Sequence, residues 1–386
     1  MKDPVRLNVH PCLFRISGRQ NTQRSGCGAS NKLKVTQPKI FEGKIMRRFG
    51  NLWDEFVSKE NWDKAVKNAL KGKKTLHSVR RFLAKGEGYS EELRQQIIDG
   101  TFEFKGYNTK FLYEPKQRKL FISRLEERFF HWACMIIVER IFEPTFIFDS
   151  YSCRKKKGQH KCSRRCMELV RQNDYCLKMD ISKFYPSINQ EILKKCLRKK
   201  IKDEKFLSEV FKIIDSYHPD GVQRGVPIGN YSSQIFGNIY MTQLDNFVKQ
   251  ELKCRFYLRY CDDFILFSND KKYLNECKHK LIAFVHDVLD MKLSKCDLFP
   301  TKRGVDFVGY RHFKEFILIR KSTAQRVKRR MRTLEACVAA GKVTAQQALG
   351  KIASAIGWTK HANSYHFVKK IKLYELKEKF QNAKIQ

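Results

Sequence analysis

Two adjacent aspartates, Asp262 and Asp263, stand in the stretch RYCDDFILFS, between RFYLRY and the apolar run FILF. Both flanks have the composition of short strands, so the pair is expected at the turn of a hairpin. A third aspartate, Asp180, ends another strand-like run, YCLKMD. Neighbouring carboxylates repel each other unless cations neutralise them, and hard oxygen ligands select Mg²⁺ or Mn²⁺. An exposed turn without any chemistry is the alternative for an isolated Asp-Asp pair.

The chemistry expected of these aspartates depends on whether they meet. If both elements belong to one sheet, the three carboxylates converge at its edge. Two metal ions about 3.5–4 Å apart in such a cluster stabilise the attacking and leaving oxygens of an in-line phosphoryl transfer. The positive charge elsewhere on the chain would then hold a nucleic acid while the carboxylates hold the metals.

That positive charge is large. The chain has 386 residues with 78 Lys and Arg against 40 Asp and Glu, a formal charge of +38. Such an excess predicts a polyanionic partner, and nucleic acid is a simpler choice than a membrane surface. The hydrophobic content of 42% is that of a globular protein. We find neither a transmembrane stretch nor a signal peptide, and the scattered cysteines suit a reducing compartment, so we expect a cytoplasmic protein.

The elements expected along the chain indicate an α+β fold. Residues 1–45 contain nine Lys or Arg and two acids, and we expect a poorly ordered basic arm there, or an upstream extension, because Met46 offers a later start. Strands and helices then occur in runs instead of a regular alternation. Helical patterns cover 52–70, 127–142, 190–201 and the segment from 320 onward. Strand patterns cover 111–123 and 255–268 as pairs, and 175–180 and 306–313 singly.

Motifs in this order resemble those of reverse transcriptases. RYCDDFILFS resembles their Y-x-D-D hairpin, and KMDISKFYPSI, 178–188, resembles the first metal-binding motif. GVPIGNYSSQIFGNIYM, 225–241, resembles the loop and helix that contact the nascent base pair, and FVGY, 307–310, resembles the primer-grip strand. YEPKQRK and SCRKKKGQH match segments of the fingers. Any one motif is weak, whereas the ordered set over residues 50–320 is specific.

The resemblance implies a right-hand polymerase with fingers, palm and a short helical thumb. We expect the basic extension in 1–45, the fingers with an N-terminal helix in 46–174, the palm in 175–313 and the thumb in 314–386. The segment 311–332, with nine Lys or Arg and one acid, suits a thumb helix that follows the template–primer backbone, unless it is only a solvated face.

The resemblance also assigns roles around the metals. Asp180 and Asp262 would ligate two Mg²⁺ ions directly, with Mn²⁺ as an alternative. Asp263 would support them or ligate in part, and the Ile181 carbonyl would add a ligand. Lys295 stands near the place of a residue that protonates the leaving pyrophosphate, although a surface charge is an equal alternative.

Three residues are expected to contact the incoming dNTP. Tyr185 would lie under its sugar and exclude a 2′-hydroxyl, although core packing is the alternative. Arg118, after a Pro-containing turn, would pair with the triphosphate, and its alternative is a solvated turn residue. Arg128 either binds a phosphate or caps the core.

One motif narrows the resemblance to the enzymes of diversity-generating retroelements. Most reverse transcriptases have Gln-Gly and then Ser-Pro, whereas this chain has Ile228-Gly229 and then Ser233-Gln234. The opening LWDEFVSKENWDKA is also similar to theirs. Members copy a template RNA with frequent errors at adenines, and the cDNA replaces part of a target gene. We hypothesise that Ile228 loosens checking of the new base pair, because it lacks the hydrogen bond of Gln; support of the loop is its alternative.

The implied partners are template RNA, an RNA–DNA hybrid, dNTPs and a small, basic, helical accessory protein that forms a ring, in a bacterial or phage-encoded system. Two other functions remain open. One is another bacterial reverse transcriptase, of the retron, antiphage or intron type. A V-T-G motif is absent from the thumb region, against the retron type, and only about seventy residues follow FVGY, against the intron type. The other is a non-catalytic RNA-binding scaffold, which would not need the three aspartates.

Overall fold

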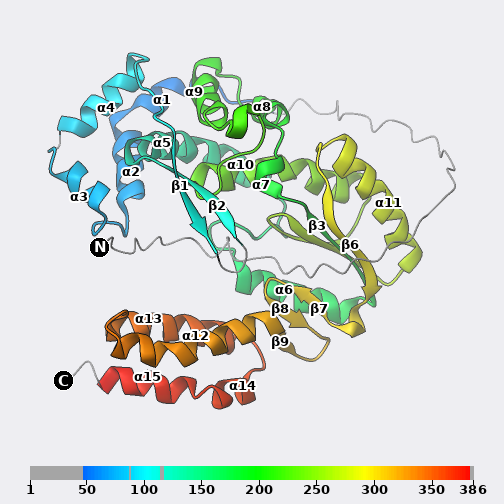
Figure 1. Ribbon diagram of the computed structural model, residues 1–386. Helices are drawn as coiled ribbons and strands as arrows, with labels where there is room; N and C mark the ends of the chain where they lie inside the picture. The colour runs from blue at the N-terminus through cyan, green and yellow to red at the C-terminus, as the bar shows by residue number, and fades with distance from the viewer. Residues whose placement is uncertain (1–46, 87, 114–116, 383–386) are drawn as a thin grey trace.

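The computed structural model describes residues 47–86, 88–113 and 117–382, so the predicted basic arm lies outside the described residues (Figure 1). Helices open the described part and surround a long buried helix, α5. One helix was predicted over 52–70, but the structure has two, because the Ser58 side chain accepts a hydrogen bond from the Asn61 backbone and starts a second helix there. These helices are α1 (Trp53–Val57), α2 (Lys59–Leu70), α3 (His77–Leu83), α4 (Gly88–Ile98) and α5 (Leu125–Phe142).

The centre of the molecule is a four-stranded antiparallel sheet in the order β4-β5-β3-β6. Side chains alternate between its faces, as the period of two requires. Leu177 and Met179 face the core that contains α5, α10 and α11, whereas Cys176 faces a second core with α6. The strands are β3 (Tyr175–Ile181), β4 (Phe256–Tyr260), β5 (Asp263–Ser268) and β6 (Leu293–Pro300); the helices around them are α6 (Gln159–Gln172), α7 (Phe184–Ser187), α8 (Gln190–Arg198), α9 (Glu204–Asp215), α10 (Tyr231–Asn246) and α11 (Lys271–Asp287).

A separate hairpin precedes α5. The pair of strands predicted over 111–123 is present, but its first strand begins four residues earlier, at Tyr107. Strands β1 (Tyr107–Leu112) and β2 (Arg118–Ser123) pair antiparallel from Tyr107 opposite Ser123 to Leu112 opposite Arg118. In Figure 1 this hairpin projects from the helices toward the C-terminal part of the molecule.

The prediction of one strand over 306–313 is wrong. The structure has a tight hairpin, β7 (Val305–Phe307) and β8 (Tyr310–His312), and β9 (Ile317–Ile319) completes a small sheet. The strand breaks because Val308 and Gly309 have φ angles of 42° and 85°. A Cβ on Gly309 would lie 2.8 Å from the Trp358 ring, so only glycine lets the C-terminal helices pack this closely.

Four helices follow β9 in the described residues: α12 (Lys321–Ala339), α13 (Ala345–Lys360), α14 (Tyr365–Lys370) and α15 (Leu373–Asn382). We call them the C-terminal bundle. Its small core, which includes Leu334, Ile352 and Leu373, is separate from those around the central sheet. The expectation of an α+β fold is confirmed, and within the described ranges no helix is both long and apolar enough to span a bilayer.

Candidate active site

The predicted hairpin is present as β4 and β5, but only one of the two aspartates expected at its turn lies in the loop. Tyr260 pairs with Asp263, so only Cys261 and Asp262 form the loop. Cys261 has a φ of 60°, which is the left-handed conformation that tight two-residue hairpin turns require at their first position. The loop therefore presents Asp262 at the end of the sheet, while Asp263 is already part of β5.

The third aspartate lies on the neighbouring strand. Asp180 of β3 is directly opposite Asp263 in the antiparallel register, so both side chains point to the same face of the sheet. The backbone N–H of Ile181 donates to the Asp262 carbonyl at 3.3 Å, which ties the loop to β3. The structure thus brings Asp180, Asp262 and Asp263 to one end of one sheet.

A bulge shapes the surroundings of Asp180. The pairing of β3 with β6 shifts between Asp180 and Ile181, and this leaves Ser294 as an extra residue. Ser294 Oγ donates to Asp180 Oδ2 at 2.6 Å and so orients the carboxylate. Lys295 is the register partner of Asp180, and its Nζ lies 3.1 Å from Asp297 Oδ2, with both side chains about half exposed. Sequence reasoning missed Ser294, because a bulge has no local signature there.

Asp263 faces a buried lysine. Lys178 stands two residues before Asp180 and therefore on the same face of the sheet. Its Nζ lies 3.5 Å from Asp263 Oδ2 and donates to the Asp306 carbonyl, and both side chains of the pair are less than a tenth exposed. Sequence reasoning missed this pair, although a lysine in phase with Asp180 inside YCLKMD was a signal that could have found it.

A second buried pair holds the hairpin itself. Arg259 Nη2 lies 2.7 Å from Asp245 Oδ2, its Nε donates to Asp245 Oδ1 at 2.8 Å, and both side chains are fully buried. Arg259 Nη1 also donates to the Cys261 carbonyl at 3.1 Å, and so it fixes the loop that carries Asp262. Burial alone would lower the pKa of Arg259, but the Asp245 carboxylate raises that pKa above its ordinary value.

Tyr185 lies beside the hairpin loop. Its hydroxyl is 3.5 Å from Cys261 Sγ, and its carbonyl accepts a hydrogen bond from the Val226 N–H at 3.0 Å. Helix α10 passes close to the ring, because a Cβ on Gly237 would lie 3.2 Å from it and 3.0 Å from the ring of Phe184. Phe184 is buried and Tyr185 half-buried, so the tyrosine is the one of the two that reaches the surface of the site.

The loop that contains Ile228 is fastened to the β1–β2 hairpin. The Ile228 carbonyl accepts from the Phe121 N–H at 2.9 Å, and the Asn230 side chain donates to the Phe121 carbonyl at 3.1 Å. Gly229 has a φ of 119°, which favours glycine at this position. Ile228 is half-buried, and so is Arg118 at the start of β2. The structure therefore joins this loop, residues 227–230 or the PIGN loop, to strand β2, which begins with Arg118.

Two further predicted residues stand apart from these contacts. Gln234 lies half-buried in the first turns of α10. Arg128 lies near the start of α5, where its Nε is buried without a hydrogen-bond partner in the described part of the chain, and burial lowers its pKa. Burial, followed by the charge of Arg128, lowers the pKa of Lys73 to about 8. No hydrogen bond or ion pair between described residues joins Arg128 to the aspartates.

The donor atoms decide which metal would fit. Among the described residues, no group of three or more His, Cys, Asp or Glu side chains is arranged to hold a metal ion. The chemistry of the donors nevertheless suits Mg²⁺, because Asp180 and Asp262 supply carboxylate oxygens at one end of the sheet. Asp263 pairs with Lys178, so Asp180 and Asp262 are the side chains that would hold an ion.

Residues 126–312 match the family described as "Reverse transcriptase (RNA-dependent DNA polymerase)". The match spans α5 to β8 and includes the three aspartates. This segment, a little under half of the chain, is thus similar to reverse transcriptase domains. With the mixed α/β architecture around a four-stranded sheet, the match confirms the predicted right-hand polymerase fold class.

Curated proteins are similar to part of this chain. The Escherichia coli K12 protein YkfC is 25% identical over 41% of this chain and 45% of its own length. The "Group II intron-encoded protein LtrA" of Lactococcus lactis subsp. cremoris is 28% identical over 44% of this chain and 30% of its own length. The chain thus spans less than half the length of these curated relatives.

Solved structures of telomerase are also similar. Telomerase of Candida albicans, in complex with a TWJ fragment of telomeric RNA, aligns with a TM-score of 0.45 and 13% identity over 75% of this chain and 64% of that chain. Apo telomerase of Candida tropicalis aligns with a TM-score of 0.44 and 14% identity over 79% of this chain and 68% of that chain.

Proposed function

We propose that the protein is an RNA-directed DNA polymerase that copies a template RNA into cDNA. The observation that carries the proposal is the placement of Asp180 opposite Asp263, with Asp262 in the adjoining two-residue loop, inside the reverse transcriptase domain. Bound divalent ions would supply the electrostatic stabilisation of an in-line phosphoryl transfer. Asp180 and Asp262 hold the ions, Ser294 and Arg259 fix the two aspartate-bearing segments, and Ile181 remains a predicted carbonyl ligand.

The same proposal assigns the substrate contacts. Tyr185 lies beside Asp262's loop and restricts the space for a 2′-hydroxyl, so dNTPs are preferred to rNTPs. Arg118 pairs with the triphosphate from the β1–β2 hairpin, which the PIGN loop fastens in place. Lys295, next to Asp180 in the register, is the proposed proton donor to pyrophosphate, and Arg128 is a weaker candidate for a phosphate contact.

We propose the division into fingers (46–174), palm (175–313) and thumb (314–386) on the same basis. The separate core of the C-terminal bundle supports an independent thumb. The predicted boundary at residue 313 falls inside the small β7–β8–β9 sheet, which joins the two parts. We place the reaction in the cytoplasm of a bacterium or of a phage-infected cell.

Primer extension on a defined RNA template tests the activity. The wild-type chain with Mg²⁺ and dNTPs should extend a DNA primer, and Asp262→Asn should abolish extension while it still binds the template–primer. A non-catalytic scaffold would give no extension with either protein and equal binding, and that result would remove the proposal.

We further propose that copying is error-prone at template adenines and serves targeted gene diversification. Ile228 supports this, because its carbonyl is fixed by Phe121 while its side chain lacks the donor that Gln would bring near the substrate. Ile228→Gln should lower misincorporation opposite adenine in sequenced cDNA, with Val222→Gln on the exposed loop as the control. Unchanged error rates would contradict the role of Ile228.

An intron-associated reverse transcriptase is the second candidate, and the similarity to a group II intron-encoded protein favours it. Accurate copying of adenines by the wild-type chain would select this candidate and retain the polymerase. For the diversifying candidate we propose a small basic accessory ring as partner. Because this chain also carries +38, the two proteins would meet mainly through RNA.

A further inference from the structure

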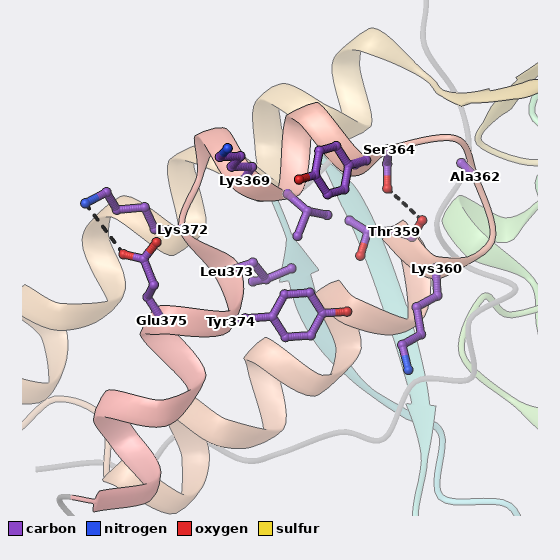
Figure 2. A pocket seen from close by; sticks show the side chains of 11 residues that line it. Thr359, Lys360, Ala362, Ser364, Lys369, Lys372, Leu373, Tyr374 and Glu375 are labelled. Carbon is purple, nitrogen blue, oxygen red and sulfur yellow. Dashed lines mark hydrogen bonds and ion pairs between the residues drawn. The ribbon is translucent and has the colours of Figure 1, made fainter.

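A groove lies in the C-terminal bundle, where the end of α13, helix α14 and the start of α15 meet (Figure 2). Its volume is about 390 Å³, and its floor includes the buried side chain of Leu373. In Figure 1, α14 and α15 lie on the side of α12 and α13 that faces away from the central sheet. The groove is therefore distinct from the candidate active site.

The charge around the groove is positive. Lys360, Lys369 and Lys372 line it, together with a single acid, Glu375. Lys372 Nζ lies 3.5 Å from Glu375 Oε2, and both side chains are exposed, so this pair contributes little. Lys360 and Lys369 form no ion pair within the described part of the chain, and both are exposed. The groove thus offers two lysine ammonium groups to an anionic ligand.

Two tyrosines add flat apolar surface to the same groove. Tyr365 is 72% exposed and Tyr374 is 46% exposed, although both belong to a bundle with a small core. Exposed aromatic rings beside lysines are the combination that binds single-stranded nucleic acid, because bases stack on the rings and phosphates meet the ammonium groups. A folded acidic surface would use the lysines but would leave the rings without partners.

The groove is also preformed. Ser364 Oγ donates to the Thr359 carbonyl at 2.8 Å, which fixes the connection between α13 and α14. The Asn363 N–H donates to the Ile317 carbonyl at 2.8 Å and anchors the same connection to β9. Lys372, with a φ of 52°, makes the sharp turn into α15. Binding a flexible strand here would not require ordering of these described segments.

We propose that this groove binds a single-stranded segment of the template RNA outside the duplex held at the active site. The inference extends the proposed function, since it assigns a second contact to the same RNA. Tyr365 and Tyr374 stack on bases, and Lys360 and Lys369 contact the phosphates between them.

Equilibrium binding with the full chain tests the proposal. The probes are an RNA–DNA hybrid with blunt ends, the same hybrid with a single-stranded RNA overhang, and one with a single-stranded DNA overhang. The wild-type chain should bind the RNA overhang probe more tightly than the blunt probe. Tyr365→Ala/Tyr374→Ala should reduce this difference by about 10-fold or more, since stacking is worth about 1–3 kcal/mol per base.

A control variant removes the same number of positive charges from a helix outside the groove. Lys271→Gln/Lys272→Gln on α11 should keep the tighter binding of the overhang probe, whereas Lys360→Gln/Lys369→Gln should reduce it. The proposal would be overturned if both groove variants still bound the overhang probe more tightly than the blunt probe. It would also be overturned if an acidic peptide, but not single-stranded RNA, competed for binding to the groove. An equal preference for the DNA overhang would overturn the restriction to RNA.

The outcome of the binding assay does not depend on whether the chain synthesises cDNA. If the wild-type chain fails to extend primers but the tyrosine variant still loses the overhang preference, the groove stands and the proposed polymerase fails. If extension works and the overhang does not tighten binding, the groove fails and the polymerase stands.

Discussion

The central sheet and the C-terminal bundle carry their charges in opposite ways. Beneath the sheet, Arg259 and Asp245 form a fully buried pair, and Lys178 meets Asp263 with both side chains nearly buried. In the bundle, the pair of Lys379 and Glu335 leaves 64% and 49% of the two side chains exposed. The buried charge pairs of the sheet region therefore fix positions, whereas the exposed pair in the bundle remains accessible to solvent and to a polyanion.

This contrast matches two requirements of the template copying that we propose. Metal ligands must be held rigidly, and buried pairs do so because each partner is costly to leave alone. A nucleic acid that moves by one nucleotide per step needs an attractive surface without fixed partners, which exposed basic residues provide. Substitutions in the two regions should consequently have their main effects in different assays.

The largest expected effect is a loss of primer extension without a loss of template–primer affinity. Asp180→Asn keeps the acceptor for Ser294 but removes the negative charge, so primer extension should fall by about 10⁴-fold. Template–primer affinity should change little. Asp287→Asn, on an exposed carboxylate of α11, is the control and should extend normally. Loss of binding in parallel with extension would contradict the separation of roles.

The next difference concerns stability. Arg259→Met leaves the buried Asp245 carboxylate with the Tyr257 hydroxyl as a donor but without its cation, and should lower the free energy of unfolding by about 3–5 kcal/mol in urea titrations. Glu335→Gln in the bundle should cost less than about 1 kcal/mol, because its pair with Lys379 is exposed. The double variant Arg259→Met/Asp245→Leu should regain much of the loss, and equal costs for the two single variants would break the comparison.

A smaller difference should follow from pH. Burial, and then the charge of Arg128, lowers the pKa of His131 to about 3, from 6.5, while burial and His160 lower that of His361 to about 4. Between pH 6.5 and these values the unfolded chain binds more protons, so stability should fall as the pH drops from 7 to 5. Urea midpoints of His131→Gln should depend less on pH than those of His361→Gln, because His131 is deeply buried and His361 is not.

The smallest expected effect is a change in salt dependence. Lys328→Gln/Arg332→Gln on α12 should lower the slope of log affinity against log salt by about 0.7–0.9 for each phosphate that the variant no longer neutralises. Extension by the bound complex should be unchanged. The charge-matched pair Lys271→Gln/Lys272→Gln on α11 should leave the slope as it is, and an equal change in both would show that only net charge matters.

Local signals in the sequence predicted the elements that hold the aspartates. A hairpin near Asp262 and a strand that ends near Asp180 depend on neighbouring residues, so each element could be predicted, whereas their meeting in one sheet was only a condition. The same is true of the β1–β2 hairpin. A Ser at position 58 was also a readable cap signal, and reading it would have split the first helix correctly.

Contacts between distant segments could not be predicted in this way. The sequence does not indicate that Asp245 would meet Arg259, since one lies on α10 and the other on β4. The bulge that places Ser294 beside Asp180 depends on the pairing of β3 with β6. The close contact of Gly309 with the Trp358 ring joins positions almost fifty residues apart. Each of these contacts joins a motif residue to a residue outside that motif.

Gly237 imposes a constraint on how this enzyme could be redesigned. Its missing side chain leaves room for the rings of Phe184 and Tyr185, which a Cβ would approach to 3.0 and 3.2 Å. The volume around the Tyr185 ring, which we propose lies beside the incoming sugar, is thus shared by two positions that lie far apart in the chain. If position 185 alone is varied, smaller side chains there leave a void beside Gly237. If alanine is also allowed at position 237, its methyl group can fill part of that void. Related sequences should show the same two positions changing size in opposite directions.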